Sequence, residues 1–331
     1  MITRPFARIT GVGMGVPARV VTNHDLEQVL DTSDEWIRER SGIAERRWAQ
    51  PGEPLVGFCE VASRQALAQA GATAGELDAI VVGTVSGDRP MPSTACQLQA
   101  VLGAGRAAAF DVSAACSGFL YALTVAEGLI ASGQARKALV LGAEKLTNVT
   151  DFGDRTTAVL FADGAGAVVL EATDGGDRGI LSSFIRSDGA LGHLLYIPGR
   201  LPATDAQGAP IPASHCGFIR MAGREVFKSA VLTMAEACDE ALRRAGVGGD
   251  AIDLLVPHQA NIRIIESTAK HAGIPMSKVF VNVDRYGNTS AASIPLALAE
   301  AVAQGRLVPG MRVLLVAFGG GFTWGSALLR W

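Results

Sequence analysis

The sequence is short of the features that mark several protein classes. Charged residues make up only 18% of the 331 residues, and the formal net charge is −3. A chain without a basic surplus has no electrostatic footprint for a nucleic-acid backbone. No run reaches the roughly 18 apolar residues that a transmembrane helix needs, and the first residues lack the cationic segment and apolar run of a secretory signal. We therefore expect a cytoplasmic protein that binds neither nucleic acid nor membrane.

Cysteine is also scarce, and its spacing excludes two kinds of site. The chain has five cysteines, and none of them forms a Cys-x-x-Cys pair. An odd number without that spacing argues against a disulfide framework and against a zinc site. Cys59 and Cys238 lie in alanine-rich helical stretches, where a cysteine is usually a buried and unreactive small residue. Reduced thiols and no bound metal are therefore expected.

What the chain does have is an internal repeat. The segment 62–81 recurs at 237–256, a shift of 175 residues. The matching positions are Ala62, Ala66, Leu67, Ala70, Gly71, Asp78 and Val81 in the first copy, and Ala237, Ala241, Leu242, Ala245, Gly246, Asp253 and Val256 in the second. Each copy predicts an alanine-rich helix that ends at an Ala-Gly pair and is followed by a strand.

A second pair of segments repeats at a shift of 173 residues. Asp111, Ser117, Leu123, Ala126 and Glu127 match Asp284, Ser290, Leu296, Ala299 and Glu300. In this register Cys116 falls opposite Thr289, and at the shift of 175 His258 corresponds to Gly83, the end of the first copy's strand. Two nearly equal shifts indicate a duplicated domain. We expect the two copies to share one cleft.

Apolar runs alternate with helical segments along the chain, and 49% of the residues are hydrophobic. Continuous apolar strands predict sheets that are covered on both faces; the runs are Ala79–Val82, Ala138–Leu141, Val279–Val283 and Val313–Phe318. We predict a β-hairpin over Asp163–Gly176 that closes the first half, a boundary near Ala172–Gly179, and two halves spanning residues 1–175 and 176–331. The proline- and glycine-rich stretch Gly199–Gly217 predicts a loop, either ordered over a site or mobile at the surface.

Cys116 stands apart from the other cysteines because of its setting. In AAAFDVSAACSGFLYALTVAEGL an apolar strand turns through small residues into an apolar helix, which places the thiol at a helix N-terminus. Such a terminus stabilises a negative charge by about 0.3–1 kcal/mol, or about 2 when buried, and one pKa unit corresponds to about 1.4 kcal/mol. We therefore expect the helix to lower the pKa of this thiol by roughly a unit, and a basic partner to complete its activation. A packed, inert cysteine is the alternative.

Two further residues are candidate partners of Cys116. His258 ends an apolar strand in DLLVPHQANIRII, just before a helix, whereas the other four histidines lie in polar or loop contexts. Asn288, in VDRYGNTSAASIP, follows Gly287, which permits a tight turn. An Asn-Thr-Ser triplet alone is typical of a helix cap, but the asparagine amide can also serve as a neutral donor.

Taken together, these motifs resemble the β-ketoacyl-acyl carrier protein synthase III family of the thiolase superfamily. The similarity runs from about Ile9 to Trp331, and its most specific motifs are TSDEWIRERSGI, DVSAACSGF, FADGAGAVVLE, VPHQANIRII, GNTSAAS and AFGGGFTWGSALLRW. The resemblance implies an α/β protein with a thiolase-like, five-layered αβαβα fold built from two duplicated halves. It also implies a homodimer and a catalytic triad of Cys116, His258 and Asn288.

The resemblance implies a decarboxylative Claisen condensation that initiates fatty-acid or related biosynthesis. Cys116 would take the acyl group of an acyl-CoA primer, and the backbone N–H groups of Cys116 and Gly320 would hold the oxyanion. His258 and Asn288 would stabilise the enolate formed when malonyl-acyl carrier protein loses carbon dioxide. The family's chemistry needs neither a metal nor a redox cofactor, so we expect none.

Binding positions follow from the same resemblance. Those expected to bind CoA are Trp36, Arg40, Arg155, Gly223, Phe227, Ala260 and Asn261. Those expected to line the acyl pocket are Phe161, Leu195 and Met91, of which Met91 would reach across the dimer interface into the partner's pocket. Those expected to dock the carrier protein are Lys228, Gln259, Arg263 and Lys270.

Other functions remain possible from the residues alone. Cysteine, histidine and asparagine also serve cysteine hydrolases, so a thioester hydrolase is an alternative, as is a specialised acyltransferase on the same fold. The glycine-rich GVGMGVP at residues 11–17 lacks the G-x-G-x-x-G spacing of a dinucleotide site. The preferred primer, the pathway and the identity of the carrier protein are not determined by these motifs.

Overall fold

The structure is a computed structural model that describes residues 6–174, 178–199, 204 and 210–331. Its larger sheet has the strand order β1-β7-β6-β4-β5. Strand β4 runs parallel to β5 and β6, whereas β7 runs antiparallel to β1 and β6. The strands are β1 (Phe6–Gly15), β4 (Ala79–Gly83), β5 (Ala108–Val112), β6 (Lys137–Lys145) and β7 (Asp163–Thr173).

The second sheet repeats this order with the later part of the chain. Its strands are β8 (Gly179–Ser187), β11 (Leu254–Pro257), β12 (Arg312–Gly319) and β13 (Thr323–Arg330), in the order β11-β12-β13-β8. Only β11 and β12 are parallel. A parallel bridge from Leu255 to Val279 occupies the place that β5 has beside β4. The two sheets therefore share one topology, as a duplication predicts.

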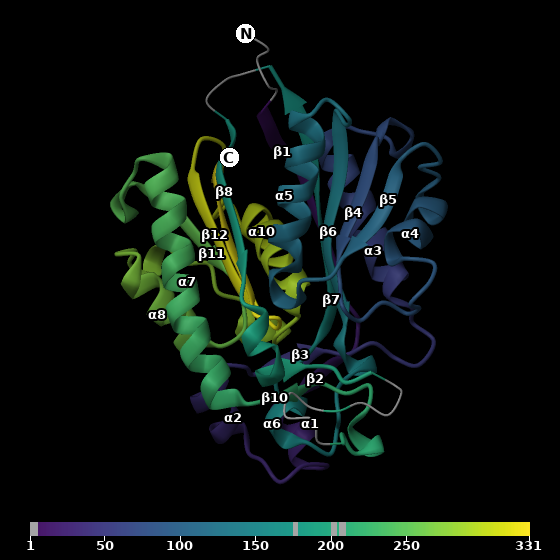
Figure 1. Cartoon of the computed structure of the whole chain (residues 1–331), viewed down its shortest axis with the longest axis vertical. Helices are drawn as coiled ribbons and strands as arrows, with labels where there is room; N and C mark the ends of the chain where they lie inside the picture. Colours follow the sequence, from purple (N-terminus) through teal and green to yellow (C-terminus); the bar gives the residue numbers. More distant parts are fainter. Residues whose placement is uncertain (1–5, 175–177, 200–203, 205–209) are drawn as a thin grey trace.

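Helices cover both faces of each sheet, and Figure 1 shows the resulting layers. Helices α5 (Gly118–Ala131) and α10 (Ser293–Ala303) lie between the sheets. The outer face of the larger sheet carries α3 (Leu55–Ala70) and α4 (Thr94–Leu102), and that of the second carries α7 (Gly223–Ala245) and α8 (Ile262–His271). The predicted five-layered αβαβα arrangement is thus confirmed. Its central helices are apolar nearly all round because both of their faces are buried.

The first repeat folds as its sequence predicts. Helix α3 ends at Gly71 and helix α7 ends at Gly246, and both glycines adopt the left-handed conformation, with φ of 63° and 66°. Only glycine adopts this conformation without steric cost, so it commonly ends helices. A 3-10 helix then leads into the strand in each half, through η1 (Ala74–Glu76) before β4 and η6 (Gly249–Ala251) before β11.

The register of the second repeat is wrong by two residues. The 3-10 helices η2 (Ala115–Ser117) and η8 (Ser290–Ala292) precede α5 and α10 at equivalent places. Because η2 begins at 115 and η8 at 290, the structural shift is 290 − 115 = 175. Cys116 therefore corresponds to Ala291 and not to Thr289. Scattered small residues do not determine this register, because a shift of either 173 or 175 residues pairs small residues with small residues.

The predicted hairpin over Asp163–Gly176 is also wrong. Residues 163–173 form the single strand β7, which pairs with β1 on one side and β6 on the other. Its glycines serve packing rather than turning, since a Cβ atom at Gly166 would come within 2.6 Å of the backbone nitrogen of Leu296 on α10. A glycine-rich run in a strand can thus mark the close approach of a helix.

Two sequence predictions fall on residues that the structure leaves undescribed. The boundary between the halves, at residues 175 and 176, lies outside the described residues, and the division stays a prediction. Residues 200–203 and 205–209 of the Gly199–Gly217 stretch lie outside them too.

Most of the remaining elements gather at one end of the molecule, below the sheets in Figure 1. They include β2 (Val20–Thr22), α1 (Asn23–Glu27), α2 (Asp34–Ser41), β3 (Glu45–Arg47), α6 (Arg155–Ala158), β9 (Leu195–Tyr196) and β10 (Arg220–Met221). Strand β2 pairs with β3, and β9 with β10. The short helices η3 (Leu146–Asn148), η4 (Gly189–Leu194), η5 (Ala213–His215), η7 (Met276–Lys278) and α9 (Val283–Tyr286) complete the chain. Within the described ranges, no helix is long and apolar enough to cross a bilayer.

Candidate active site

The turn between β5 and α5 carries Cys116, as the strand–turn–helix pattern predicts. Ala115 has a φ of 44°, an uncommon left-handed conformation for a residue other than glycine, and it redirects the chain before the helix. The end of β12 packs directly on this turn, because a Cβ atom at Gly319 would lie 2.5 Å from the backbone nitrogen of Cys116. Only glycine fits at position 319.

His258 follows β11, and its main-chain nitrogen extends the pairing with β12 by donating to Val316 at 2.8 Å. The imidazole is buried, with 3% of its surface exposed. Its Nδ1 lies 2.7 Å from the hydroxyl oxygen of Ser293, and that oxygen also accepts the backbone N–H of Gln259 at 3.3 Å. Ser293 thereby fixes the orientation of the ring. Sequence reasoning missed Ser293, although it lies in the GNTSAAS motif.

Backbone hydrogen bonds to neighbouring residues hold Asn288 in place. Its N–H donates to the carbonyl of Leu160 at 2.9 Å, and its carbonyl accepts from Ala162 at 3.0 Å. The preceding Gly287 has a φ of 62°, which supplies the tight turn that the sequence predicts. The side-chain Oδ1 accepts the N–H of Ser290 at 2.9 Å. Among the described residues, none accepts a hydrogen bond from the Nδ2 group. Its N–H donors are therefore left for the cavity.

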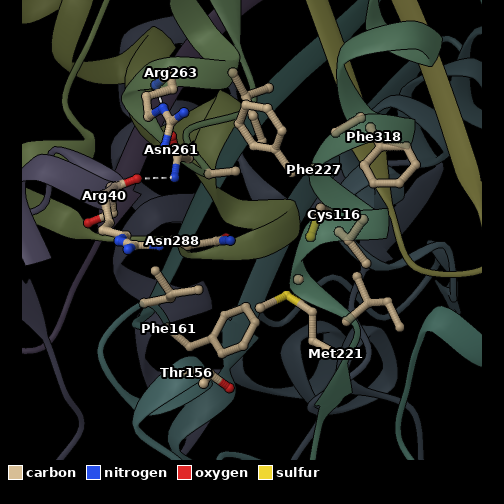
Figure 2. A pocket seen from close by; sticks show the side chains of 18 of the residues that line it. Arg40, Cys116, Thr156, Phe161, Met221, Phe227, Asn261, Arg263, Asn288 and Phe318 are labelled. Carbon is tan, nitrogen blue, oxygen red and sulfur yellow. Dashed lines mark hydrogen bonds between the residues drawn. The ribbon is translucent and has the colours of Figure 1, made fainter. Parts of the chain in front are cut away.

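Cys116, His258 and Asn288 line one cavity of about 550 Å³. We call it the arginine-lined cavity, because its wall includes Arg40, Arg224 and Arg263. Figure 2 shows Arg40 and Arg263 on one side of this space and Cys116 on the other, with Asn288 between them. The structure thus brings the three predicted catalytic residues together from both halves of the sequence.

A second cavity of about 480 Å³ begins at the same thiol. We call it the aliphatic cavity, because its lining includes Leu146, Val149, Ile197 and Ile219. Phe161 and Leu195 line both cavities, together with Cys116. Gly320, the predicted oxyanion-hole residue, lines the aliphatic cavity. Cys116, the candidate nucleophile, therefore lies where the arginine-lined cavity and the aliphatic cavity meet.

Burial governs the protonation of the two reactive side chains. It raises the pKa of the Cys116 thiol to about 12 and lowers the pKa of the His258 imidazole to about 3. Removing a charge from water opposes ionisation of both groups. The sequence-based expectation that the helix N-terminus leaves this thiol activated is therefore wrong for the resting site, where desolvation outweighs the dipole. At neutral pH both side chains are therefore uncharged, and a Cys116 thiolate forms only when the thiol proton is transferred during the reaction.

The predicted CoA-binding residues lie around the arginine-lined cavity with one exception. Trp36, Arg40, Gly223, Phe227, Ala260 and Asn261 all line it. Arg155 instead stands beside the cavity, with its guanidinium carbon 5.6 Å from the Trp36 ring centre and its Nη1 3.1 Å from the carboxylate of Asp31. Arg40 lies 5.3 Å from the same ring, so two cations border this aromatic surface.

Asn261 has a structural task at this cavity. Its Oδ1 accepts the N–H of Arg263 at 2.8 Å, which caps helix α8. Its Nδ2 donates to the carbonyl of Arg40 at 2.7 Å, the contact drawn as a dashed line in Figure 2. Both polar atoms of Asn261 are thus engaged, and they tie α8 to α2.

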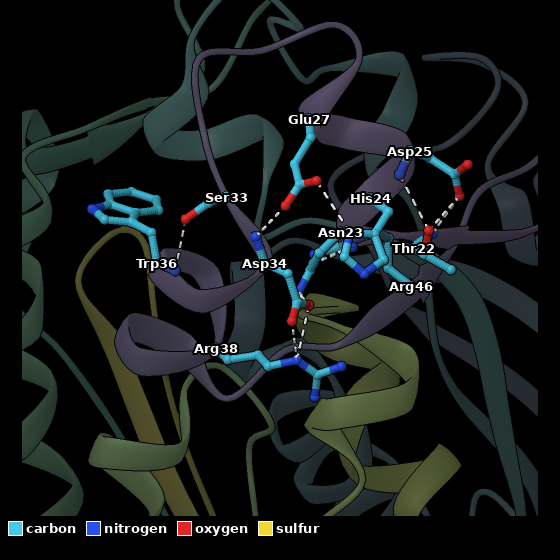
Figure 3. Close-up of polar contacts among 10 residues, drawn as sticks. All are labelled: Thr22, Asn23, His24, Asp25, Glu27, Ser33, Asp34, Trp36, Arg38 and Arg46. Atoms are coloured by element: carbon cyan, nitrogen blue, oxygen red, sulfur yellow. Dashed lines mark hydrogen bonds and ion pairs between the residues drawn. The ribbon is translucent and has the colours of Figure 1, made fainter.

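A buried arginine holds α2 in place, as Figure 3 shows. Arg46 has no exposed surface; it donates to Asn23 Oδ1 at 2.8 Å and to the carbonyl of Val159 at 2.9 Å. Asn23 in turn donates to Asp34 Oδ1 at 2.8 Å. This chain of hydrogen bonds connects the first turn of α2, which carries Trp36, to the cavity wall at Val159. No sequence motif pointed to Arg46.

The carrier-docking predictions divide into three exposed residues and one buried residue. Lys228, Arg263 and Lys270 are exposed, and Arg263 also stacks over Phe227 at 5.4 Å. Gln259, in contrast, is 1% exposed. Its side chain donates to the carbonyls of Pro257 and Phe280 and accepts the N–H of Asn282. The prediction that Gln259 docks a partner is therefore wrong, because its amide links interior segments.

Met91 lies outside both cavities of this chain and is 84% exposed. In the described ranges, no cluster of three histidine, cysteine or acidic side chains could hold a metal ion. The two buried cysteines predicted to be inert, Cys59 and Cys238, have no exposed surface. Burial raises the pKa of both thiols, that of Cys238 to about 12.

A five-layered fold with a cysteine, a histidine and an asparagine on one cavity defines the class of thiolase-like condensing enzymes. Comparison with known proteins agrees. Residues 110–189 match the family described as 3-oxoacyl-[acyl-carrier-protein (ACP)] synthase III, and residues 242–331 match its C-terminal part. The chain belongs to the 3-oxoacyl-[acyl-carrier-protein] synthase III family, and it is a condensing acyltransferase.

Full-length relatives support this assignment. The chain is 53% identical to the β-ketoacyl-[acyl-carrier-protein] synthase III of Rhodospirillum centenum, over 98% of each chain. The crystal structure of the Aquifex aeolicus enzyme has a TM-score of 0.91 at 47% identity, covering 98% of this chain and 100% of that one. The Thermus thermophilus structure has a TM-score of 0.93 at 44% identity, covering 98% and 99%. These matches favour the condensing enzyme over the hydrolase alternative.

Proposed function

We propose that this enzyme condenses an acyl-CoA primer with malonyl-acyl carrier protein and so initiates fatty-acid or related biosynthesis. The observation that carries the proposal is the position of Cys116 at the junction of two cavities. A CoA thioester in the arginine-lined cavity would place its acyl group in the aliphatic cavity, with the thioester carbon at the thiol. The names of the relatives support acyl carrier protein as the partner.

In the first half-reaction, Cys116 attacks the thioester carbonyl. The sulfur forms the new bond, the thiol proton leaves, and CoA departs as its thiol after the tetrahedral oxyanion collapses. The N–H groups of Cys116 and Gly320 hold that oxyanion in the proposal. That proton passes to the departing CoA sulfur, and His258 stays neutral because burial holds the pKa of its imidazole at about 3.

In the second half-reaction, malonyl-acyl carrier protein loses carbon dioxide and leaves an enolate. Asn288 Nδ2 and His258 Nε2 would donate to the enolate oxygen, because the Ser293 hydroxyl can donate to Nδ1 and leave the proton on Nε2. The enolate carbon attacks the acyl-enzyme carbonyl, and the Cys116 thiolate leaves and takes up a proton from solvent, which restores the neutral thiol. Malonyl decarboxylation supplies the carbanion, so the proposed cycle uses no metal or redox cofactor.

Three further features of the proposal concern the assembled protein. We place it in the cytoplasm and propose a homodimer, in which Met91 of one subunit enters the partner's acyl pocket. The resemblance to the family supports this, and the high exposure of Met91 in the single chain leaves its side chain accessible to a partner. The exposed Lys228, Arg263 and Lys270 form the proposed docking surface for the acidic carrier protein.

The proposal is tested by incubating the enzyme with acyl-CoAs of graded length and malonyl-acyl carrier protein. We expect an acyl adduct by intact mass spectrometry, whose mass identifies the primer, and β-ketoacyl-acyl carrier protein as the product. Hydrolysis of acyl-CoA without carbon–carbon bond formation would contradict the proposal.

Replacing Met91 with phenylalanine should shift the primer preference towards acetyl-CoA. Methionine is thinner and more adaptable than phenylalanine, so the wild type should accept acyl groups longer or more branched than acetyl. One methylene group in an apolar pocket is worth about 10- to 200-fold in discrimination. Turnover of acetyl-CoA relative to longer acyl-CoA measures the effect. An unchanged ratio would show that Met91 is an ordinary surface residue.

Replacing Arg263 with alanine should weaken carrier-protein docking while sparing acylation by acyl-CoA. An exposed charge steers an acidic partner over about 8–10 Å at physiological ionic strength. The apparent KM for malonyl-acyl carrier protein should rise by up to about fivefold, with a weaker salt dependence. Arg306→Ala is the matched control, since Arg306 is exposed and lies outside both cavities. Equal loss of both half-reactions would assign Arg263 a structural role.

A further inference from the structure

A fully buried carboxyl group lies close to the nucleophile, and the mechanism above does not use it. Glu144 is near the end of β6 and has no exposed surface. Its Oε2 accepts the backbone N–H of Val85 at 3.1 Å and the hydroxyls of Thr84 and Ser86. Its Oε1 has a different partner, the Ser290 hydroxyl, at 3.1 Å. Since a backbone N–H can only donate, Oε2 must accept, and the proton of the neutral acid belongs on Oε1.

Ser290 stands between this carboxyl and Cys116. Both Ser290 and Cys116 line the aliphatic cavity, and donation from the Ser290 hydroxyl lowers the pKa of the Cys116 thiol. The Ser290 backbone is held in the left-handed region, with a φ of 49°, by the bond from its N–H to Asn288. A hydroxyl has one proton to donate. Ser290 can therefore donate to the carboxylate or to the sulfur, but not to both.

We propose that Glu144 is a positioning residue that controls the Cys116 thiolate through the Ser290 hydroxyl. When neutral, Glu144 donates from Oε1 to Ser290, and Ser290 donates to the thiolate. When ionised, Glu144 draws the Ser290 proton to itself, and its charge repels the thiolate as well. The inference rests on the proposal that Cys116 is the nucleophile.

The carboxyl titrates in the range where this control would operate. Burial raises the pKa of Glu144 to about 7, and its charge in turn opposes ionisation of two thiols, Cys116 and, on α3, Cys59. Strand β4 carries no titratable residue. Other titratable side chains on the elements around β6 are turned to other partners: Lys145 to Glu53, Asp163 to Thr147, Lys137 to Glu171, Glu60 to Arg64, Tyr121 to Arg186, Glu127 to Ser183 and Glu300 to Arg285.

The test is the rate at which iodoacetamide alkylates Cys116 across pH, followed by mass on the Cys116 peptide. In Glu144→Gln, the amide oxygen can take the three donors of Oε2, and the NH₂ group can donate to Ser290, so the variant mimics the neutral acid at every pH. The alkylation rate of the variant should match that of the wild type below about pH 6 and exceed it above about pH 8. The excess should be about tenfold for each unit by which ionised Glu144 raises the pKa of Cys116. Coinciding curves would overturn the proposal.

Ser290→Ala tests the same link in the opposite pH range, and it suffices if Glu144→Gln does not fold. It should slow alkylation below about pH 6, where the relay supports the thiolate, and approach the wild type at high pH; a ratio independent of pH would count against the proposal. Glu127→Gln is the matched control, because Glu127 is a partly buried carboxyl that also has a serine partner, but lies far along α5. No substrate is present, so a failure of Cys116 to become acylated would be a separate result.

Discussion

Replacing Cys116 with alanine is expected to abolish the acyl-enzyme completely. Alanine has no atom that can form a thioester, and the other four cysteines lie outside both cavities. The wild type incubated with acyl-CoA should gain the mass of one acyl group per chain, and Cys116→Ala should gain none. Release of β-ketoacyl-acyl carrier protein should fall with it, because condensation needs the acyl group on the enzyme.

Cys238→Ala provides the control for this experiment. Cys238 is buried on α7, and removing its sulfur tests whether any cysteine substitution disturbs the fold enough to stop acylation. We expect it to acylate normally. An acyl adduct on Cys116→Ala would assign the nucleophile to another residue.

Replacing Asn288 with alanine is expected to separate the two half-reactions. Acylation of Cys116 should continue, because Asn288 is assigned to the enolate and not to the thiolate. Decarboxylation and condensation should slow by about 10²–10³, the usual cost of losing one oxyanion donor. Acyl adduct formation by mass and carbon dioxide release from malonyl-acyl carrier protein measure the two steps separately.

Asn288→Asp distinguishes hydrogen-bond donation from packing. Aspartate keeps the size of asparagine and an oxygen that can accept the N–H of Ser290, but it replaces the Nδ2 donor by an acceptor. If donation matters, Asn288→Asp should be as defective in condensation as Asn288→Ala. Condensation at the wild-type rate in either variant would remove Asn288 from the enolate site.

The elements that the sequence predicted well are those with a strong local signal. The strand–turn–helix at Cys116 and the helices ending at Gly71 and Gly246 are all present. Glycine caps and buried apolar runs depend on backbone sterics and solvent exclusion over a few residues. The family motifs extend this local information along the whole chain, and the fold and activity class were therefore predicted correctly.

The predictions that failed depended on what a residue meets in space. Gly166 packs against α10 instead of making a turn. Gln259 lies beside His258 in sequence, yet its amide makes its hydrogen bonds inside the molecule. The helix dipole at Cys116 was predictable, but the burial that outweighs it was not, since desolvation depends on every segment that closes around the thiol.

The amino-acid order alone thus establishes a duplicated α/β chain with three candidate reactive residues and the chemistry that their types permit. Their meeting at the junction of two cavities, and the coupling of Glu144 to Cys116 through Ser290, appear only in the folded chain. Residues 144 and 290 are 146 positions apart. Glu144 lies on strand β6 of the larger sheet, and Ser290 lies on the 3-10 helix η8 that precedes α10. Contacts of that range arise from the packing of layers around a common core, which no local pattern encodes.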